Sequence, residues 1–398
     1  MAVATAAAVQ GHRGAVSGWD VVARSLQSGV RGGRKERRAG PDLPTCRVGH
    51  RGSVIDARAA RWRSVWQPGS MQRPLVPLVL VAAVLLLGAI VLFGRSASSQ
   101  EQPADGEVAP PPVRVAAGPD AESALLAHTL RALLGLQDVD AEVVAFGAAR
   151  DTRQALVLGD VDLRPAYTGE AWLETLGRAD PPGDPRRSFE EVRTHDAQQG
   201  LVWFRPPFLE GIDSPPANPT FAFMVAGPPS IDADLGTMSQ LASRLSAQPE
   251  ATLCVDPEFA ARPDGLRAVL AAYSVRSDQP VLAAGPEDAV RGVAVGACIA
   301  GLTTATDGLA WSAGLRPLED DLEVFPAFVA LPQARRDAML ERPEISLRIS
   351  PMASQLTTEL VGTWNARVVA GETIEEVAED AARELAARAG WPLPQEAA

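Results

Sequence analysis

The chain has 398 residues, 46% of them hydrophobic and 22% charged, which is enough for two domains with sizeable cores. Its formal net charge is −12, and residues 71–398 hold 25 Lys+Arg against 45 Asp+Glu, whereas residues 1–70 hold 12 against 4. An acidic main body argues against a nucleic-acid partner, because binding to phosphates requires basic surfaces.

The first 70 residues differ in composition from the rest of the chain. They are rich in Arg and Gly and show little hydrophobic periodicity, which is typical of disorder. The stretch "MQRPLVPLVLV", which starts at Met71, resembles a complete secretory N-terminus by itself. We therefore expect residues 1–70 to be disordered or not translated, with translation beginning at Met71.

Twenty uncharged residues, Leu75–Gly94, follow this start. A helix of this length crosses a hydrocarbon core of ~30 Å, and the basic residues upstream of it place the acidic body outside the cytoplasm. Residues 71–95 are thus predicted to be a signal anchor in the cell membrane, or a signal peptide cut near Ser96-Ala97-Ser98 that leaves a secreted protein. A buried core helix is the weaker alternative, because so long an uncharged run is rare in soluble domains. No cysteine closely follows the run, which excludes a lipid-modified N-terminal cysteine.

Beyond a Ser/Pro/Glu-rich tether at 96–112, strand and helix patterns alternate. A Pro/Asp/Arg-rich region interrupts them at 178–190. In this first series, strands are expected at 113–118, 141–147, 161–167, 200–207 and 220–227, and helices at 121–135 and 151–158. Such alternation predicts βαβ units and a parallel sheet.

A second series of the same kind follows. Helices are expected at 236–246 and 266–274, and strands at 251–256, 280–285 and 293–301. An apolar segment at 324–332 is then followed by mostly helix to residue 390. We therefore expect two α/β lobes, lobe 1 from residues 113–217 and 325–398 and lobe 2 from 218–324, with the chain crossing between them twice. Sheets of this type bind ligands in clefts at the carboxyl ends of their strands.

No catalytic or metal-binding motif stands out in the sequence. It contains no GxSxG, Walker loop, HExxH or GxGxxG after a strand, and its four histidines are scattered. Cys254 and Cys298 lie in apolar segments, where they are expected to be buried thiols or, in an exported protein, a disulfide. We expect no cofactor and no metal.

The remaining candidates are aromatic residues beside turns. Tyr167, one of two tyrosines, ends an expected strand, Phe221 lies at the first expected crossing, and Phe325 and Phe328 lie at the second. Aromatic rings that meet in a cleft bind cations, quaternary ammonium groups above all. For each Phe taken singly, ordinary core packing is the simpler explanation.

The order of several motifs matches a known family over about residues 113–390. The segments are VRVAAGPDAESALLA (113–127), ALVLGDVDLRPAYTGEAW (155–172), NPTFA (218–222), EFAARPDG (258–265) with Tyr273, TTATDGLAWSAGLRPLEDDLEVFPAFVALP (303–332), and Trp364-Asn365 through Val368. With them, the chain resembles the substrate-binding proteins of osmoprotectant ABC transporters, which bind glycine betaine, choline and related amines. The resemblance implies a type II periplasmic-binding-protein fold with a hinge cleft. It also implies delivery of a small cationic or zwitterionic solute to an ABC permease subunit, without catalysis.

The resemblance also implies a set of ligand-binding residues. In the family, tyrosines form the ammonium cage; Tyr167 stands at one such position, Phe221 and Phe328 at two others, and Thr304 at a fourth. Arg262 could hold an anionic group of the solute, whereas Gly118 falls where many members have a lysine. Glu170 replaces a threonine, and its carboxylate would favour a cation such as choline. Two alternatives remain: an enzyme on the same scaffold, and a degenerate sensor or envelope scaffold without a transport role.

Overall fold

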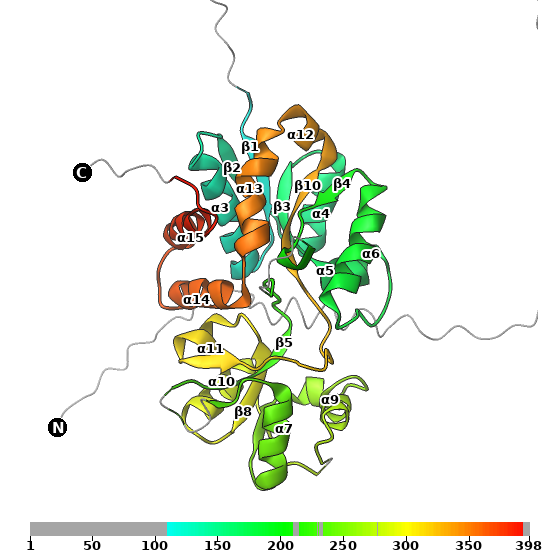
Figure 1. Cartoon of the computed structure of the whole chain (residues 1–398), viewed down its shortest axis with the longest axis vertical. Coiled ribbons are helices and arrows are strands. Elements are labelled where there is room, and N and C mark those ends of the chain that lie inside the picture. Colours follow the sequence, from blue (N-terminus) through cyan, green and yellow to red (C-terminus); the bar gives the residue numbers. More distant parts are fainter. Residues whose placement is uncertain (1–109, 210–214, 229, 231–233, 277, 393–398) are drawn as a thin grey trace, which may run out of the picture. The chain divides into compact units, whose positions relative to one another are not determined.

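The computed structural model of the chain describes residues 110–392, apart from 210–214, 229, 231–233 and 277. Two five-stranded sheets organise this part of the chain (Figure 1). The first sheet has the order β2 (Ala141–Ala145), β1 (Val113–Ala117), β3 (Leu163–Tyr167), β10 (Ala330–Arg335) and β4 (Leu201–Trp203). β1, β2 and β3 are parallel, and β10 runs antiparallel to β3 and β4.

The second sheet repeats this plan. Its order is β7 (Val281–Ala283), β6 (Leu253–Val255), β8 (Ala300–Thr304), β5 (Phe221–Ala226) and β9 (Leu315–Pro317). β6, β7 and β8 are parallel, and β5 runs antiparallel to β8 and β9. We call the parts of the chain built around the first and second sheets lobe 1 and lobe 2.

The side chains of β1 point alternately to the two faces of the first sheet, and helices cover both faces. Val115 packs in the cluster that contains Leu126 of α3, whereas the next residue, Ala116, packs with Leu156 of α4. The helices of lobe 1 are α3 (Ala121–Gly135), α4 (Ala149–Leu158), α5 (Thr168–Glu170), the π-helical turn η2 (Ala171–Thr175), α6 (Pro185–Ala197), the 3-10 turn η3 (Pro207–Leu209), α12 (Arg336–Glu341), α13 (Glu344–Gln355), α14 (Thr358–Val369) and α15 (Ile374–Arg388).

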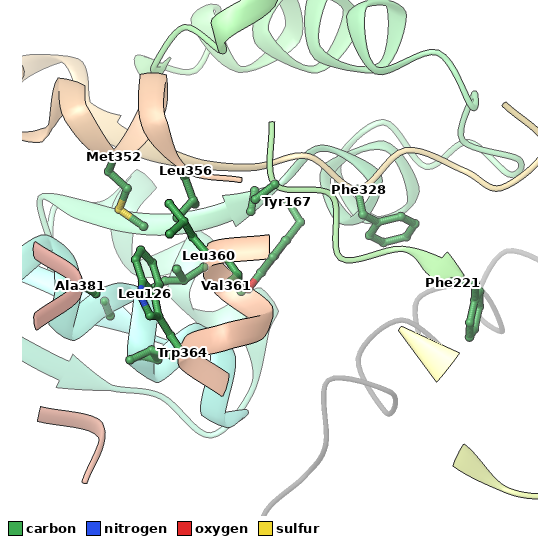
Figure 2. Packing of buried hydrophobic residues seen from close by; sticks show 14 of the residues in the cluster. Leu126, Tyr167, Phe221, Phe328, Met352, Leu356, Leu360, Val361, Trp364 and Ala381 are labelled. Carbon is green, nitrogen blue, oxygen red and sulfur yellow. The ribbon is translucent and has the colours of Figure 1, made fainter. Parts of the chain in front are cut away.

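α3 and α15 form the largest helix pair of this lobe. The Asp120 side chain caps α3 by accepting from the Ser123 N–H, and Thr373 and Glu376 form a capping box at the start of α15. Figure 2 shows Leu126 of α3 beside Trp364 of α14, both fully buried. Apolar stripes and well-formed caps thus fix these helices, as the sequence pattern of α3 predicts.

Lobe 2 has the same two-faced arrangement. Met224 faces Val290 and Val293 of α10, whereas its neighbour Phe223 lies in the cluster with Leu241 of α7 and Val269 of α9. Cys254 of β6 forms a disulfide with Cys298, so the paired alternative is the one found. The helices of this lobe are α7 (Met238–Ala247), α8 (Pro257–Ala261), α9 (Leu266–Ala272), α10 (Pro286–Ala294) and α11 (Gly308–Ser312).

Two crossing segments, residues 217–220 and 326–329, connect the sheets and lie side by side. The Thr220 hydroxyl donates to the Pro326 carbonyl at 2.6 Å, and the Phe328 N–H donates to Asn218 Oδ1 at 2.7 Å. Lobe 2 also contacts lobe 1 through α11, which packs on α14. A Cβ at Gly362 of α14 would overlap the Trp311 indole of α11, so this helix pair requires a glycine there.

Two expectations from the sequence were wrong in detail. The strand expected at 293–301 is the end of α10 and a turn at Gly296 (φ +75°), and β8 starts only at Ala300. The interruption at 178–190 contains the start of α6, which Asp184 caps and Pro185 opens. The apolar segment 75–94 lies outside the described residues, and among the helices that are described none is long and apolar enough to span a membrane.

Candidate functional site

A cavity of about 360 Å³ opens between residues of the two lobes. Lobe 1 contributes Leu173 of η2 and the loop Ala179–Pro181, whose Asp180 has the left-handed φ of 57°. The other lining residues come from β5, from α8 and the turn after it, and from the second crossing: Phe221, Phe259, Arg262, Pro263, Asp264, Val324, Phe325 and Pro326. This cavity is the part of the described structure best suited to a small solute.

Three phenylalanine rings form the apolar side of the cavity. Phe259 lies between the other two, with ring centroids 5.1 Å from Phe221 and 6.3 Å from Phe325. Phe221 begins β5, Phe259 is held in α8 by the Asp256 cap, and Phe325 follows a turn whose Asp320 accepts its N–H. Rings fixed in this way present faces that attract cations.

Arg262 is the basic residue of the cavity lining. Its guanidinium lies 5.8 Å from the centroid of the Phe259 ring and forms an ion pair with Asp264. The Arg262 pairing holds the pKa of the Asp264 carboxyl below its usual range. The Arg262 guanidinium is therefore itself a cation bound at the Phe259 ring, and its charge is balanced by the Asp264 carboxylate.

Tyr167 lies apart from this lining, in a buried polar cluster at the carboxyl end of β3. Its hydroxyl donates to Glu122 Oε1 at 3.0 Å. Glu122 Oε2 accepts from the Thr306 hydroxyl at 2.5 Å and from Asn365 Nδ2 at 2.9 Å. Glu122 belongs to the first turn of α3, Thr306 follows β8 and Asn365 lies on α14, so the cluster joins both lobes.

Burial changes the acidity of this cluster. Desolvation, with a smaller contribution from the Asp120 charge, raises the pKa of Glu122 to about 7, although its three hydrogen bonds act in the opposite direction. Desolvation and the neighbouring Glu122 charge also raise the pKa of the Tyr167 hydroxyl. Near neutral pH the Glu122 carboxyl is therefore close to half-protonated.

The contacts of the two residues after Tyr167 explain the turn Tyr-Thr-Gly in physical terms. The Thr168 hydroxyl accepts the Val329 N–H at 3.0 Å, which attaches the end of β3 to the second crossing. A Cβ at Gly169 would overlap the ring of Phe328. The turn thus needs a hydroxyl at one position and no side chain at the next.

The other residues expected at the site are buried and lie outside the cavity lining, apart from Phe221 and Arg262. Glu170 is 4% exposed, and its Oε1 lies 3.6 Å from Nη1 of the buried Arg164. Phe328 is buried against Gly169, and Thr304 is buried in β8, opposite Phe221 of β5. In Figure 2 the Phe221 ring lies away from Tyr167 and Phe328. Of the six expected residues, Phe221 and Arg262 line the cavity.

Sequence reasoning missed Glu122, Phe259, Asp264 and Thr306 as candidates. Phe259 and Asp264 stand in the EFAARPDG motif, and Thr306 precedes Asp307 in the TDG motif, so their position was visible but their role was not. Glu122 stands in the VRVAAGPDAESALLA motif, but an acidic residue in the first turn of a helix commonly serves only the helix dipole.

Several known proteins are similar to this chain. The family described as the substrate binding domain of ABC-type glycine betaine transport systems matches residues 111–384. The glycine betaine-binding protein YehZ of Escherichia coli is 27% identical over 279 residues, which cover 68% of this chain and 89% of that protein. A glycine-betaine-binding protein of Pseudomonas aeruginosa is 29% identical over 248 residues, 58% of this chain and 74% of that protein.

Solved structures agree with this result. Apo YehZ from Escherichia coli superposes with a TM-score of 0.62 at 25% identity, covering 71% of this chain and all (100%) of that chain. A structure described as a glycine betaine/carnitine/choline ABC transporter gives a TM-score of 0.60 at 22% identity, with 68% and 98% covered. The chain therefore has the two-lobed α/β fold of periplasmic-binding proteins.

Proposed function

Since the chain belongs to the family of substrate-binding domains of ABC-type glycine betaine transport systems, we propose that it binds a quaternary-ammonium solute between its lobes and delivers it to a permease. Members of this family are extracytoplasmic solute-binding proteins rather than enzymes. The strand order β2-β1-β3-β10-β4, in which a late strand returns to the first sheet, supports the type II arrangement that the motifs imply. The two crossing segments are then the hinge.

The observation that carries the proposal is the group of rings Phe221, Phe259 and Phe325 in the cavity between the lobes. A ring face contributes roughly 0.5–2 kcal/mol to the binding of a cation. The acidic residue Asp180 lines the same cavity and adds attraction for a positive charge, whereas the charges of Asp264 and Arg262 balance each other. The rings and the Asp180 carboxylate together favour an ammonium group.

Choline is the solute we expect to bind most tightly. A betaine carries its own carboxylate and would need a free cation, whereas the guanidinium of Arg262 is paired with Asp264. A Cβ at Gly118, where a lysine would serve the same purpose, would come within 2.7 Å of Ser123 Oγ. That Tyr167, Phe328, Thr304 and Glu170 complete the solute site remains part of the proposal.

We also propose that residues 75–94 anchor the protein to the cell membrane or direct its secretion. The uncharged run of 20 residues supports this, as does the Cys254–Cys298 disulfide, which suits an oxidising compartment. N-terminal sequencing and membrane fractionation of the native protein distinguish an anchor from a cleaved signal.

Isothermal titration of the full-length protein tests the solute assignment. Choline, glycine betaine and proline betaine are compared with 3,3-dimethyl-1-butanol, a neutral isostere of choline. We expect choline to bind most tightly and the neutral isostere to bind far more weakly. Phe221→Leu should weaken choline by roughly 2- to 30-fold, and Phe221→Tyr, which keeps the ring, should not. Failure of all three amines to bind below millimolar concentration would refute the proposal.

A further inference from the structure

A single carboxyl group, that of Glu122, connects three parts of the structure. It follows β1 directly, in the first turn of α3, where Asp120 caps the helix. Its Oε1 faces the Tyr167 hydroxyl of β3, and its Oε2 accepts from Thr306 and Asn365. The side chain is therefore fixed at both oxygens.

Thr306 belongs to lobe 2, and lobe 1 holds it at two atoms. Its hydroxyl donates to Glu122, and its carbonyl accepts from Asn365 Nδ2 at 2.9 Å. The preceding residue, Ala305, donates its N–H to Thr220 of the first crossing segment at 2.8 Å. Thr306 also lies just before α11, which packs on α14 of lobe 1, so a rotation of lobe 2 that separates these two helices would remove Thr306 from Glu122.

The hydrogen bonds fix where a proton on Glu122 would be. The Asn365 amide donates to both Glu122 Oε2 and the Thr306 carbonyl, so its NH₂ group faces two acceptors, and Oε2 already receives two donors. Oε1 faces only the Tyr167 hydroxyl, which can donate to a carboxylate or accept from a carboxylic acid. A proton from solvent thus forms its O–H bond at Oε1, and the Tyr167 hydroxyl reverses its role.

The charged groups around α3 leave this carboxyl without a basic partner among the described residues. Asp120 and Tyr167 act on it directly, and Glu170 acts on those two. Asp307, next to Thr306, binds the Thr303 hydroxyl and the Ala310 N–H. On the elements packed against α3, the basic residues have other partners. These pairs are Arg114 with Asp162, Arg164 with Glu170 and Gln333, Arg348 with Gln137, Arg367 with Glu372 and Asp380, Arg383 with Asp380, and Arg388 with Glu384; His128 and Arg131 of α3 itself face Glu375 and Glu379.

We propose that Glu122 is a positioning residue that couples closure of the lobes to uptake of one proton. In the closed form its protonated carboxyl holds the Tyr167 ring and binds Thr306 across the lobes. In the open form Thr306 withdraws, water reaches the carboxylate and the proton is released. The link to solute binding rests on the proposed function, in which closure captures the solute.

The size of the coupling follows from the two environments. A Glu122 pKa of about 7 with Thr306 in place, against the ordinary value of 4.5 for an exposed carboxyl, makes closure about tenfold less favourable at pH 8 than at pH 6. Solute affinity should fall by the same factor, because the solute binds the closed form. Choline itself does not titrate in this range, so the pH dependence belongs to the protein.

Distance measurements between spin labels test closure without any solute. Leu340 and Val295 are 73% and 77% exposed and lie on different lobes, so Leu340→Cys and Val295→Cys provide label sites once Cys46→Ser removes the remaining thiol. We expect the population with the shorter distance to fall between pH 6 and pH 8. Glu122→Gln, which fits the same hydrogen bonds, should abolish the change, and Glu174→Gln, a control at another carboxyl of raised pKa, should keep it. Distances independent of pH, or a pH response that survives in Glu122→Gln, would overturn the inference.

Calorimetry with choline in buffers of different ionisation enthalpy then counts protons. We expect uptake of roughly 0.9 protons at pH 6 and roughly 0.1 at pH 8, and none in Glu122→Gln. No uptake on choline binding overturns the inference while leaving the proposed function intact. A pH-dependent distance with no binding of any amine refutes the solute assignment and leaves the Glu122 coupling standing.

Discussion

Replacement of Glu122 by Gln should change how the stability of the protein depends on pH. Gln has the size of Glu and can accept from Thr306 and Asn365 with its oxygen while its NH₂ group donates to the Tyr167 hydroxyl. It carries no charge at any pH. The variant therefore removes the titration of one buried group and preserves its packing.

The magnitude follows from the raised pKa. Burial raises the pKa of Glu122 from 4.5 in an unfolded chain to about 7 in the fold. The folded state then binds more protons than the unfolded state between these values, so stability falls as the pH rises from about 4.5 to about 7 and is constant above. With 1.36 kcal/mol per pKa unit, the loss is at most about 3 kcal/mol. Opening of the lobes makes this loss of stability smaller, because the Glu122 carboxylate becomes hydrated in an open form that is still folded.

Urea unfolding of both proteins at pH 5, 6, 7 and 8 measures the effect. The difference in the free energy of unfolding between Glu122→Gln and the wild type isolates Glu122, since every other titrating group cancels. From pH 5 to pH 8 we expect the variant to become more stable relative to the wild type by about 1 to 3 kcal/mol, in line with the pKa shift. A difference that stays constant with pH, or that moves in favour of the wild type, would refute the assigned burial of the carboxyl.

Three further predictions concern stability. Glu170→Gln should destabilise the protein by about 3–5 kcal/mol, because it leaves the guanidinium of Arg164 buried without its carboxylate; chemical denaturation measures this, and an unchanged stability would contradict the buried pair. Gly169→Ala should cost about 1–3 kcal/mol through overlap of its Cβ with the Phe328 ring, whereas Gly147→Ala, with open space around it, should cost less in the same thermal scan. Reduction of the Cys254–Cys298 disulfide, which closes a separation of 44 residues, should lower the free energy of unfolding by about 2–5 kcal/mol, as a comparison with and without reductant will show.

The order of elements could be predicted from the sequence because most of it depends on local patterns. The helical spacing of Leu126 and Leu130 and the Asp120 cap determine α3, and short β-branched runs such as Val113–Ala117 determine the central strands. The pattern failed at 293–301, where small apolar residues suit a helix end as well as a strand. Only the positive φ of Gly296 and the pairing of β8 with β5 and β6 decide between them.

The site could be predicted less well, because its geometry depends on residues far apart in the chain. The motifs indicated Phe221 and Arg262, which line the cavity, since both lie in segments that end at the cleft. They could not show that Arg262 is paired with Asp264 or that Glu170 is paired with Arg164, because a pairing depends on side-chain direction. Glu122 is separated from Thr306 by 184 positions and from Asn365 by 243, and no local pattern links such residues.

The contacts of Tyr167 give a reason for a tyrosine at this position in a chain with only two. A buried hydroxyl requires a partner, which Tyr167 finds in Glu122, whereas Phe221 and Phe328 make ring contacts and need no such acceptor. The other tyrosine, Tyr273, follows the same rule, because its hydroxyl binds the carboxylate of Asp320. If the Tyr167 hydroxyl serves Glu122 rather than the solute, Tyr167→Phe should still bind choline. It should also remove a hydrogen bond that lowers the pKa of Glu122, and so shift the pH dependence of choline affinity to higher pH.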